Sequence, residues 1–539
     1  MLWVALHLPS LSLESFAATL ASRESPAAEP PIALLEAHHV VSANAAARAE
    51  GVKPGLKRAT ALALAPRIIL GQADATRDAE ALWPVAHAAL AFTPSVSLQP
   101  ASQPGAAPDT VLLEVRASLR YFGGIERLLQ GIEAALAPLG HAVRVATAAT
   151  AQGAALLART EPPPRCLDLI ATRRALEDAP VWLLGPGREH WEALQGMGLR
   201  TFGDLLGLPR AGLARRFSEA MLVEIDAAFG HRPDPREAIV LAPAFESRLE
   251  LFARADTTDQ VLHGAAVLLE RLIAWLSAQH AFVRRFRLLM HHESRWSSSS
   301  RTGECTAQAT ALEIALAEPA RDSSHLLVLL RERLAHVQLP AATLELRLQA
   351  EDISKQAPPN AELFATSGSE HEGLTRLIER LQARLGAGQV QRLVAMEDHR
   401  PERASASRPA DAAGFGTSDD AGRKSSAARR ARQGTLIKTG DGAAVESGAM
   451  APRPVWLQSP QPLAEQGGRP LFEGRALQLL SGPERIEAGW WDSGLAGRDY
   501  FIAEAADGAL LWIYRERLAL AREDSAASGS GWFLHGRFG

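Results

Sequence analysis

The order of apolar segments between residues 245 and 350 constrains the fold of this chain more than any other feature. Alternating apolar and polar residues predict strands, and a spacing of three to four predicts helices. The order that results is strand, helix, strand, strand, helix, strand, which is typical of a split βαβ fold. The predicted strands are Ser247–Phe252, Phe282–Met290, Thr310–Ala317 and Leu344–Leu348, and the helices span 261–276 and Ser323–Val337.

Residues 1–165 have the pattern of a separate α/β domain, as a chain of 539 residues is too long for one core. Short apolar runs predict buried strands, and the runs between them have helical spacing. We expect strands at residues 2–8, Ile32–Leu35, Val111–Val115 and Val143–Ala146, with a helical insertion at roughly 40–90.

Residues 166–240 predict a helical domain that contains a helix, a glycine-rich hairpin and a second helix over Leu194–Leu206. Gly196 and Gly198 would form the tight turn and expose backbone N–H groups that bind a DNA phosphate. Spacing alone leaves equally open a helical hairpin that packs only for stability.

The last third of the chain changes composition twice. Residues 351–403 contain a candidate peptide and a helix, and residues 404–452 are too poor in apolar residues to fold, which predicts a flexible linker. Residues 453–539 predict a small β-rich module with many aromatic residues. We expect Trp490 and Trp491 in its core, and Trp532 and Phe533 at a partner-binding surface.

Composition excludes several classes of protein. The net charge of −4 provides no general attraction to nucleic acid, and two cysteines without CxxC spacing argue against a disulfide scaffold or a zinc module. No stretch predicts a membrane span or a signal peptide, and the P-loop motif is absent. We expect a cytoplasmic, nucleoid-associated protein with no membrane contact and no cofactor.

Three motifs resemble those of the Y-family DNA polymerases. Aligned on Glu14, the opening strand places Ala5 and His7 where the family has its magnesium-binding aspartates. The segment from Ser42 to Gly55 is similar to the fingers motif Ser-x-Asn-Tyr-x-Ala-Arg-x-x-Gly-Val-x-x-Gly, and Arg48 occupies the position of the arginine that contacts the incoming triphosphate. Ala45 replaces the family's tyrosine.

The palm motif of the family aligns with the segment from Asp109 to Val115. Asp109 retains one possible metal ligand, but Thr110 stands at the position of the catalytic glutamate. Thr150 and Ala151 replace a conserved Asn-Lys pair. Two-metal phosphoryl transfer needs several oxygen ligands, so these replacements predict a protein without a catalytic metal site. A site at Asp109 and Glu114, or at His7, is possible from the residue types but less favoured than a structural role.

The whole chain resembles one inactive branch of this family, the ImuB proteins of bacterial mutasomes, through its opening Leu-Trp-Val-Ala-Leu-His-Leu-Pro and the segment from Ser481 to Asp492. The resemblance implies palm and fingers domains, a helix-hairpin-helix thumb and a little finger. It also implies partners: the DNA sliding clamp, an error-prone C-family DNA polymerase, the RecA-like ImuA protein, and primed or damaged DNA.

Two local sites follow from this resemblance. The segment Pro358–Phe364 follows the last little-finger strand and is similar to a clamp-binding peptide, in which Asn360 is the polar anchor and Leu363 and Phe364 fill the pocket. A pair that only covers the adjacent domain is the alternative. Arg284, Arg285 and Arg287, with Arg295 and Arg301, could bind DNA phosphates or form a solvated strand surface.

The sequence therefore favours a non-catalytic adaptor in damage-induced translesion DNA synthesis and mutagenesis within the SOS response. One alternative is an active Y-family polymerase with atypical metal ligands. A second is a DNA-binding module that acts through the little finger and the hairpin alone.

Overall fold

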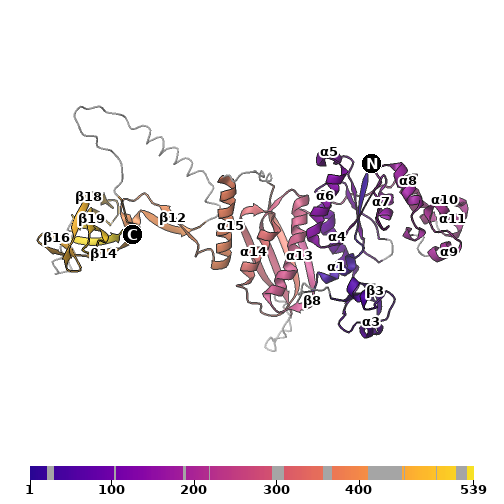
Figure 1. Ribbon diagram of the computed structural model, residues 1–539, viewed down its shortest axis with the longest axis horizontal. Helices are drawn as coiled ribbons and strands as arrows, with labels where there is room; N and C mark the ends of the chain where they lie inside the picture. Colours follow the sequence, from indigo (N-terminus) through magenta and orange to yellow (C-terminus); the bar gives the residue numbers. More distant parts are fainter. Residues whose placement is uncertain are drawn as a thin grey trace, which may run out of the picture. The chain divides into compact units, whose positions relative to one another are not determined.

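The computed structural model describes residues 1–20, 30–101, 105–185, 190–217, 219–293, 309–355, 367–410, 452–454, 456–492, 494–517 and 531–538. The chain divides into two compact units, Met1–Arg384 and Leu385–Gly539 (Figure 1). The first unit combines sheets and helices, and the second is built mainly from strands. This confirms the predicted fold class of α/β and α+β domains followed by a β-rich module.

The palm is a four-stranded antiparallel sheet whose strands lie in the order β5, β6, β1 and β7. Val4 and Leu6 point to one face, which the helices α4 and α6 cover. Ala5 points to the other face, where the small residues of the sheet let the alanine-rich helix α7 pack closely. The elements are β1 (Trp3–His7), β5 (Val96–Leu98), β6 (Thr110–Glu114), β7 (Arg144–Ala148), α4 (Ala75–Leu90), α6 (Ile125–Leu136) and α7 (Ala151–Leu157).

The predicted insertion at roughly 40–90 does contain helices, but the prediction omitted a small sheet in this region. Strand β2 (Ile32–Glu36) pairs with β3 (His39–Ala43) and with β4 (Ile69–Gln72) in a separate three-stranded sheet, outside the palm sheet. Two short helices, α2 (Ala45–Ala49) and α3 (Arg58–Leu64), complete this small core. The strand β3 was missed because its five residues precede an alanine-rich helix almost directly.

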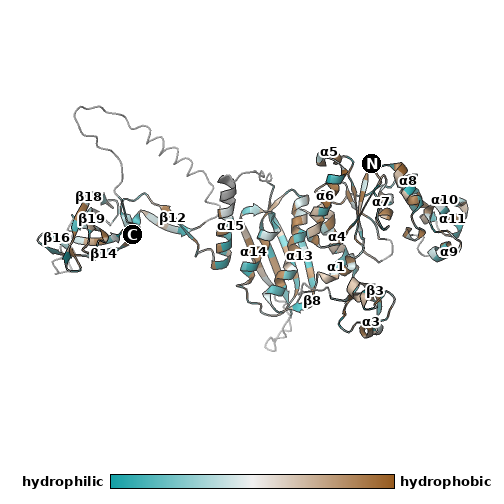
Figure 2. Cartoon of the chain, in the orientation of Figure 1, coloured by the Kyte–Doolittle hydropathy of each residue, from teal (hydrophilic) through white to brown (hydrophobic). Residues whose placement is uncertain are grey.

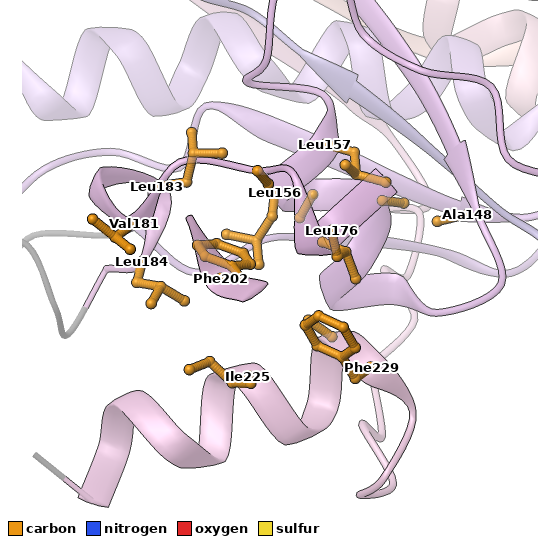
Figure 3. Close-up of a cluster of buried hydrophobic side chains, with 14 of the residues drawn as sticks. Ala148, Leu156, Leu157, Leu176, Val181, Leu183, Leu184, Phe202, Ile225 and Phe229 are labelled. Carbon is orange, nitrogen blue, oxygen red and sulfur yellow. The ribbon is translucent and has the colours of Figure 1, made fainter. Parts of the chain in front are cut away.

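In the described residues, the thumb contains five α-helices around an apolar core. Figure 3 shows Ile225 and Phe229 of the last helix pointing toward Phe202 and Leu176 of the other helices. Leu156 and Leu157 of the palm helix α7 belong to the same cluster, so thumb and palm share one core. The helices are α8 (Leu169–Glu177), α9 (Trp191–Gly196), α10 (Phe202–Leu206), α11 (Arg210–Arg216) and α12 (Glu219–Phe229).

The little finger has the predicted split βαβ topology. Its first two strands, β8 and β9, are joined by the helix α13 and are separated by β11, which is antiparallel to both. The edge strand β10 completes the sheet, and α14 packs on the same side as α13. The elements are β8 (Phe245–Ala255), α13 (Thr258–Ala278), β9 (Phe282–His292), β10 (Ala309–Ala320), α14 (Ser323–Leu334) and β11 (Thr343–Ser354).

Helix α13 is the one helix, among the described residues, that is long and apolar enough to span a membrane. Its apolar residues, including Leu268, Leu272 and Trp275, are instead buried against the little-finger sheet. It also lies beside α4, and both helices are rich in hydrophobic residues (Figure 2). Helix α13 is therefore the core helix of the little finger.

The second unit contains a five-stranded antiparallel sheet and two smaller groups of strands. The large sheet has the order β14 (Trp456–Pro462), β21 (Trp532–Arg537), β20 (Leu510–Glu516), β19 (Ala496–Glu504) and β18 (Gln478–Ala488). Three short strands form a separate sheet: β15 (Ala464–Gln466), β16 (Arg469–Phe472) and β17 (Arg475–Ala476).

The predicted flexible linker at 404–452 is wrong at its start, because its first residues are part of a strand. Ser405–Pro409 form strand β13, which pairs with β12 (Gln391–Ala395). The turn between these strands is fixed to the module, because Arg400 bonds Asp492 at 2.7 Å and Glu402 accepts a bond from Arg498 at 3.0 Å. Isolated strand pairs are marginal, so the polar composition of this segment concealed a hairpin that the module stabilises. Residues 411–451 lie outside the described residues.

Candidate vestigial catalytic site and binding surfaces

The end of strand β1 carries a polar group formed by His7, Thr110 and Asp109, at the positions that the sequence alignment compared with metal ligands. The strand register places His7 opposite Thr110. The Thr110 hydroxyl donates to Asp109 Oδ1 at 2.8 Å, so the 3.0 Å contact between His7 Nδ1 and Thr110 Oγ1 requires the imidazole N–H to donate. Arg159 Nη2 donates to the same Asp109 oxygen at 2.9 Å.

These contacts keep Asp109 ionised. Burial alone would raise its pKa, but the interactions with His7, Arg159 and Thr110 outweigh burial and hold the pKa of the Asp109 carboxyl far below its ordinary range. The negative charge of the Asp109 carboxylate is therefore compensated by Arg159.

The residues at this position do not fit a pair of magnesium ions. Ala5 is fully buried under α7, so the site that the family alignment assigns to a carboxylate is closed by packing. Glu114 lies at the other end of strand β6 and accepts hydrogen bonds from the backbone N–H groups of Leu2 and Arg116 at 3.0 and 3.3 Å. Within the described part of the chain, no three His, Cys, Asp or Glu side chains are grouped to hold a metal.

Arg48 lies at the start of the fingers region, on helix α2. It lines a cavity of about 650 Å³ together with Ser10 and Glu14 from the palm and with His263 and Glu270 from helix α13. Asp109 is not among the residues that line this cavity. The vestigial nucleotide site at Arg48 and Asp109 therefore stays a prediction.

Two residues of the family motifs have structural roles here. Asn44 caps helix α2 by accepting a bond from Ala47 N at 2.9 Å, and it also accepts one from Ile32 N at 3.0 Å. Glu14, in α1 (Leu11–Ala17), contacts His141 at 3.0 Å and Ala142 N at 3.1 Å. These contacts fix the fingers and the start of the chain without any ligand.

A polar network between palm and thumb was not predicted from the sequence. Glu224 on α12 accepts bonds from Gln152 Nε2 at 2.7 Å and from Gly185 N at 3.1 Å. The Gln152 carbonyl in turn accepts bonds from Arg236 and Gln99. Burial raises the pKa of Glu224 to about 7, although its hydrogen bonds and the charge of Arg159 act against this shift. Nothing in the local sequence marks Glu224, because its partners come from distant segments.

The helix-hairpin-helix is present, but the backbone N–H groups of its turn already donate hydrogen bonds within the chain. Gly198 has a φ of +84° and makes the turn, whereas Gly196 belongs to helix α9. The N–H groups of Met197, Gly198 and Leu199 donate to carbonyls of α9. The prediction that Gly196 and Gly198 both shape the turn is therefore wrong for Gly196.

The backbone N–H groups just before helix α10 also donate hydrogen bonds within the chain. The Asp204 carboxylate accepts the N–H groups of Arg200 and Thr201 at 2.8 and 2.9 Å, in a capping box with Thr201. An acidic side chain thus takes the place that a phosphate would need at the start of α10. These contacts favour the stability role that the sequence left open.

The little-finger arginines lie on strand β9 and form ion pairs. Arg285 and Arg287 both contact Glu313 of the neighbouring strand, at 3.0 and 3.2 Å. Arg284 lies 3.4 Å from the hydroxyl of Ser354. Two exposed arginines therefore share one carboxylate, which leaves one net positive charge in this group. Arg295 and Arg301 lie outside the described residues.

The predicted clamp-binding peptide, Asn360, Leu363 and Phe364, also lies outside the described residues. The elements that flank it are described: strand β11 ends at Ser354, and helix α15 (Ser367–Leu385) begins three residues after Phe364. The peptide is therefore a connection between two elements of the little-finger region.

The aromatic residues of the second unit are distributed in the opposite way to the prediction. Trp532 is only 4% exposed and packs in the core with Leu534, and Phe533 stacks on Tyr514 with ring centroids 5.1 Å apart. Trp490 is 79% exposed and Trp491 is 52% exposed. Trp532 points into the core from strand β21, which is paired on both sides, whereas Trp490 and Trp491 follow the end of β18 and lie outside the named strands.

Fold and site together define a mixed α/β protein with palm, fingers, thumb and little-finger regions, in which Ala5 and His7 of β1 lie opposite Leu112 and Thr110 of β6. Over 504 residues, the chain is 28% identical to Protein ImuB from two strains of Caulobacter vibrioides; the similarity covers 91% of this chain and 100% of that protein. The chain is accordingly an ImuB-like protein. No protein-family model matches it.

Solved structures with a similar arrangement include a ternary complex of Dbh and a DinB from Sulfolobus solfataricus. Each is 15% identical to this chain, with a TM-score of 0.36, and the match covers 66% of this chain and 99% of the solved chain. A Y-family polymerase chimera, Dbh-Dpo4(243-245)-Dbh, matches over the same shares at 14% identity and a TM-score of 0.36.

Proposed function

We propose that the chain is a non-catalytic adaptor in damage-induced translesion DNA synthesis. In this function it links an error-prone C-family DNA polymerase and a RecA-like accessory protein to the sliding clamp and to DNA, in the cytoplasm at the nucleoid. The observation that carries the proposal is the state of Asp109. This carboxylate is paired with Arg159, while Ala5, His7 and Thr110 supply no carboxylate beside it.

Phosphoryl transfer needs a nucleophile, a leaving group and two metal ions held by several oxygen ligands. The palm retains the strand framework of such a site but offers one carboxylate that is already compensated. A protein of this kind contributes by binding: it raises the effective concentration of a separate polymerase at the primer end without catalysing the reaction itself.

Primer extension tests the absence of catalysis. We expect the purified chain to add no nucleotide to primed DNA with Mg²⁺ or Mn²⁺ while it remains folded. Incorporation that Asp109→Ala abolishes would contradict the adaptor and establish an active polymerase with atypical ligands.

Clamp binding tests the adaptor directly. We expect Leu363→Ala with Phe364→Ala to weaken binding of the purified sliding clamp by at least about tenfold, since the two side chains would fill its pocket. Leu393→Ala, which removes a leucine that is 79% exposed on β12, is the matched control. Equal clamp binding by the wild-type chain and the double variant would exclude this peptide as the clamp contact.

A further inference from the structure

Helix α15 is fixed to the little finger through one of its sides. Glu379 is buried, and its carboxylate accepts a bond from Ala317 N at 2.6 Å and contacts His325 Nε2 at 2.9 Å. Ile378 and Ala383 are buried beside it. The helix thus covers the edge strand β10 and packs next to α14 (Figure 1). Its orientation is set by these contacts.

The other side of α15 carries four exposed leucines. Leu374, Leu377, Leu381 and Leu385 are 42%, 53%, 37% and 55% exposed. At about 100° per residue, their spacing of three, four and four places them in one stripe along the helix. We call these four residues the leucine stripe. It points away from the side that Glu379 and Ala383 anchor.

A row of arginines runs beside the leucine stripe. Arg376, Arg380 and Arg384 are spaced by four residues and are exposed. Arg376 contacts Asp322 at 3.4 Å and Arg380 contacts Glu332 at 3.7 Å. Both arginine side chains are more than half exposed, and ion pairs of this kind contribute little energy. The row therefore retains positive potential along one flank of the stripe.

We propose that the leucine stripe is a docking surface for an amphipathic helix of a partner protein, and that the apolar side of this helix is flanked by Asp or Glu. Leucines at i, i+3 and i+7 are the usual anchors in contacts between a helix and a groove or a second helix. The arginine row sets the charge of the partner through electrostatic complementarity. Because α15 is already fixed, the partner does not have to order it on binding.

A second copy of this chain is the less favourable occupant. In an antiparallel pair with twofold symmetry the two arginine rows would face each other, and like charges at that position are destabilising. In a parallel pair each row would face the flank that carries Gln382, which supplies no negative charge. The inference goes beyond the adaptor proposal and does not depend on it.

Synthetic helical peptides test the surface on the full-length chain. One fluorescent peptide has leucines at i, i+3, i+7 and i+11 with glutamates on both flanks, and a second has lysines in place of the glutamates. We expect the glutamate peptide to bind at least about tenfold more tightly in fluorescence anisotropy. Equal affinities for both peptides, or binding of neither, would overturn the proposal.

Variants assign the binding to the leucine stripe. Leu377→Glu with Leu381→Glu should reduce binding of the glutamate peptide at least about tenfold. Ile170→Glu, which changes a residue that is 75% exposed on α8, should have no effect. Arg380→Glu with Arg384→Glu should reverse the preference toward the lysine peptide without removing any leucine; an unchanged preference would contradict the role of the arginine row.

Sedimentation velocity tests whether a second copy of this chain binds the leucine stripe. We expect the wild-type chain to sediment in the same way as the Leu377→Glu, Leu381→Glu variant. A dimer that forms only with the intact leucine stripe would assign the surface to self-association and overturn the proposal of an acidic partner helix.

Discussion

At the scale of single residues, the charged side chains of this protein are mostly compensated by other side chains of the chain itself. Asp109 is held by Arg159, the Asp204 carboxylate caps its own helix, and Glu313 is shared by two arginines. Asp109 would have to change partner to bind a metal ion. The backbone N–H groups held by Asp204, and the arginines held by Glu313, would have to change partner to bind a phosphate. The buried Glu224 and the shared Glu313 each lead to a prediction.

The first concerns Glu224. Its pKa of about 7 lies above the value of an exposed glutamate, so the folded state loses stability as pH rises from about 4.5 to about 7 and is unaffected above that range. The shift corresponds to about 3 kcal/mol. Glu224→Gln should abolish this pH-dependent loss in urea unfolding. Glu219→Gln, an exposed position on the same helix, should retain it.

The second concerns the DNA contact of the little finger. Glu313→Gln releases Arg285 and Arg287 from their shared carboxylate, so affinity for primed DNA should rise and the plot of log affinity against log salt should steepen by about one unit. Glu250→Gln removes the same charge from another strand of the sheet, outside the pairs of Arg285 and Arg287. If both variants change binding equally, net charge rather than release of these arginines determines the effect.

At the scale of elements, the sequence predicts helices and strands correctly where apolar residues recur at regular spacing, and incompletely where they do not. The elements of the little finger were predicted in type and order, although its strands extend beyond the predicted ranges, because its helices are long and its strands contain alternating apolar residues such as Leu312 and Ile314 on β10. In the fingers sheet β2 was predicted, but β3 was missed because it precedes an alanine-rich helix almost directly, and β4 because it has only four residues. Burial in the C-terminal module could not be predicted either: Trp490 and Trp532 have the same residue type, and only the strand pairing decides which of them is covered.

A prediction at this scale concerns the segment between β18 and β19. Trp490 is largely exposed, whereas Trp491 lies 5.7 Å from the Arg400 guanidinium and so also supports the fold. Trp490→Ala should therefore weaken binding of the C-family polymerase or of the RecA-like protein at least about tenfold, as exposed tryptophans at interfaces do, without lowering the melting temperature. Trp456→Ala, which removes another exposed tryptophan from strand β14, is the control.

At the scale of the whole molecule, the position of the β12–β13 hairpin redefines the C-terminal module. Arg400 and Arg403 bind Asp492, and Glu402 binds Arg498, so residues before the predicted linker belong to the module that follows it. Gly489 fits this arrangement because a Cβ atom there would overlap Arg400 and the carbonyl of Gly494.

Fragments test this boundary. A fragment of residues 386–539 should unfold cooperatively, because it retains the hairpin and its ion pairs. A fragment of residues 453–539 should melt at a lower temperature, since Asp492 and Arg498 lose their partners. Calorimetry on both fragments measures the difference, and equal melting temperatures would show that the hairpin adds nothing to the module.

The two ends of the segment 411–451 are attached to the same module, at Arg400 through Asp492 on one side and at Arg453 through Glu484 on the other. Along the chain, the residues between Leu385 and Gln391, and not this segment, therefore join the module to the unit that precedes it. A fluorescent protein could be inserted at 430 as a reporter for microscopy without lengthening that connection. Variation in the length of this segment would likewise leave the length of that connection unchanged.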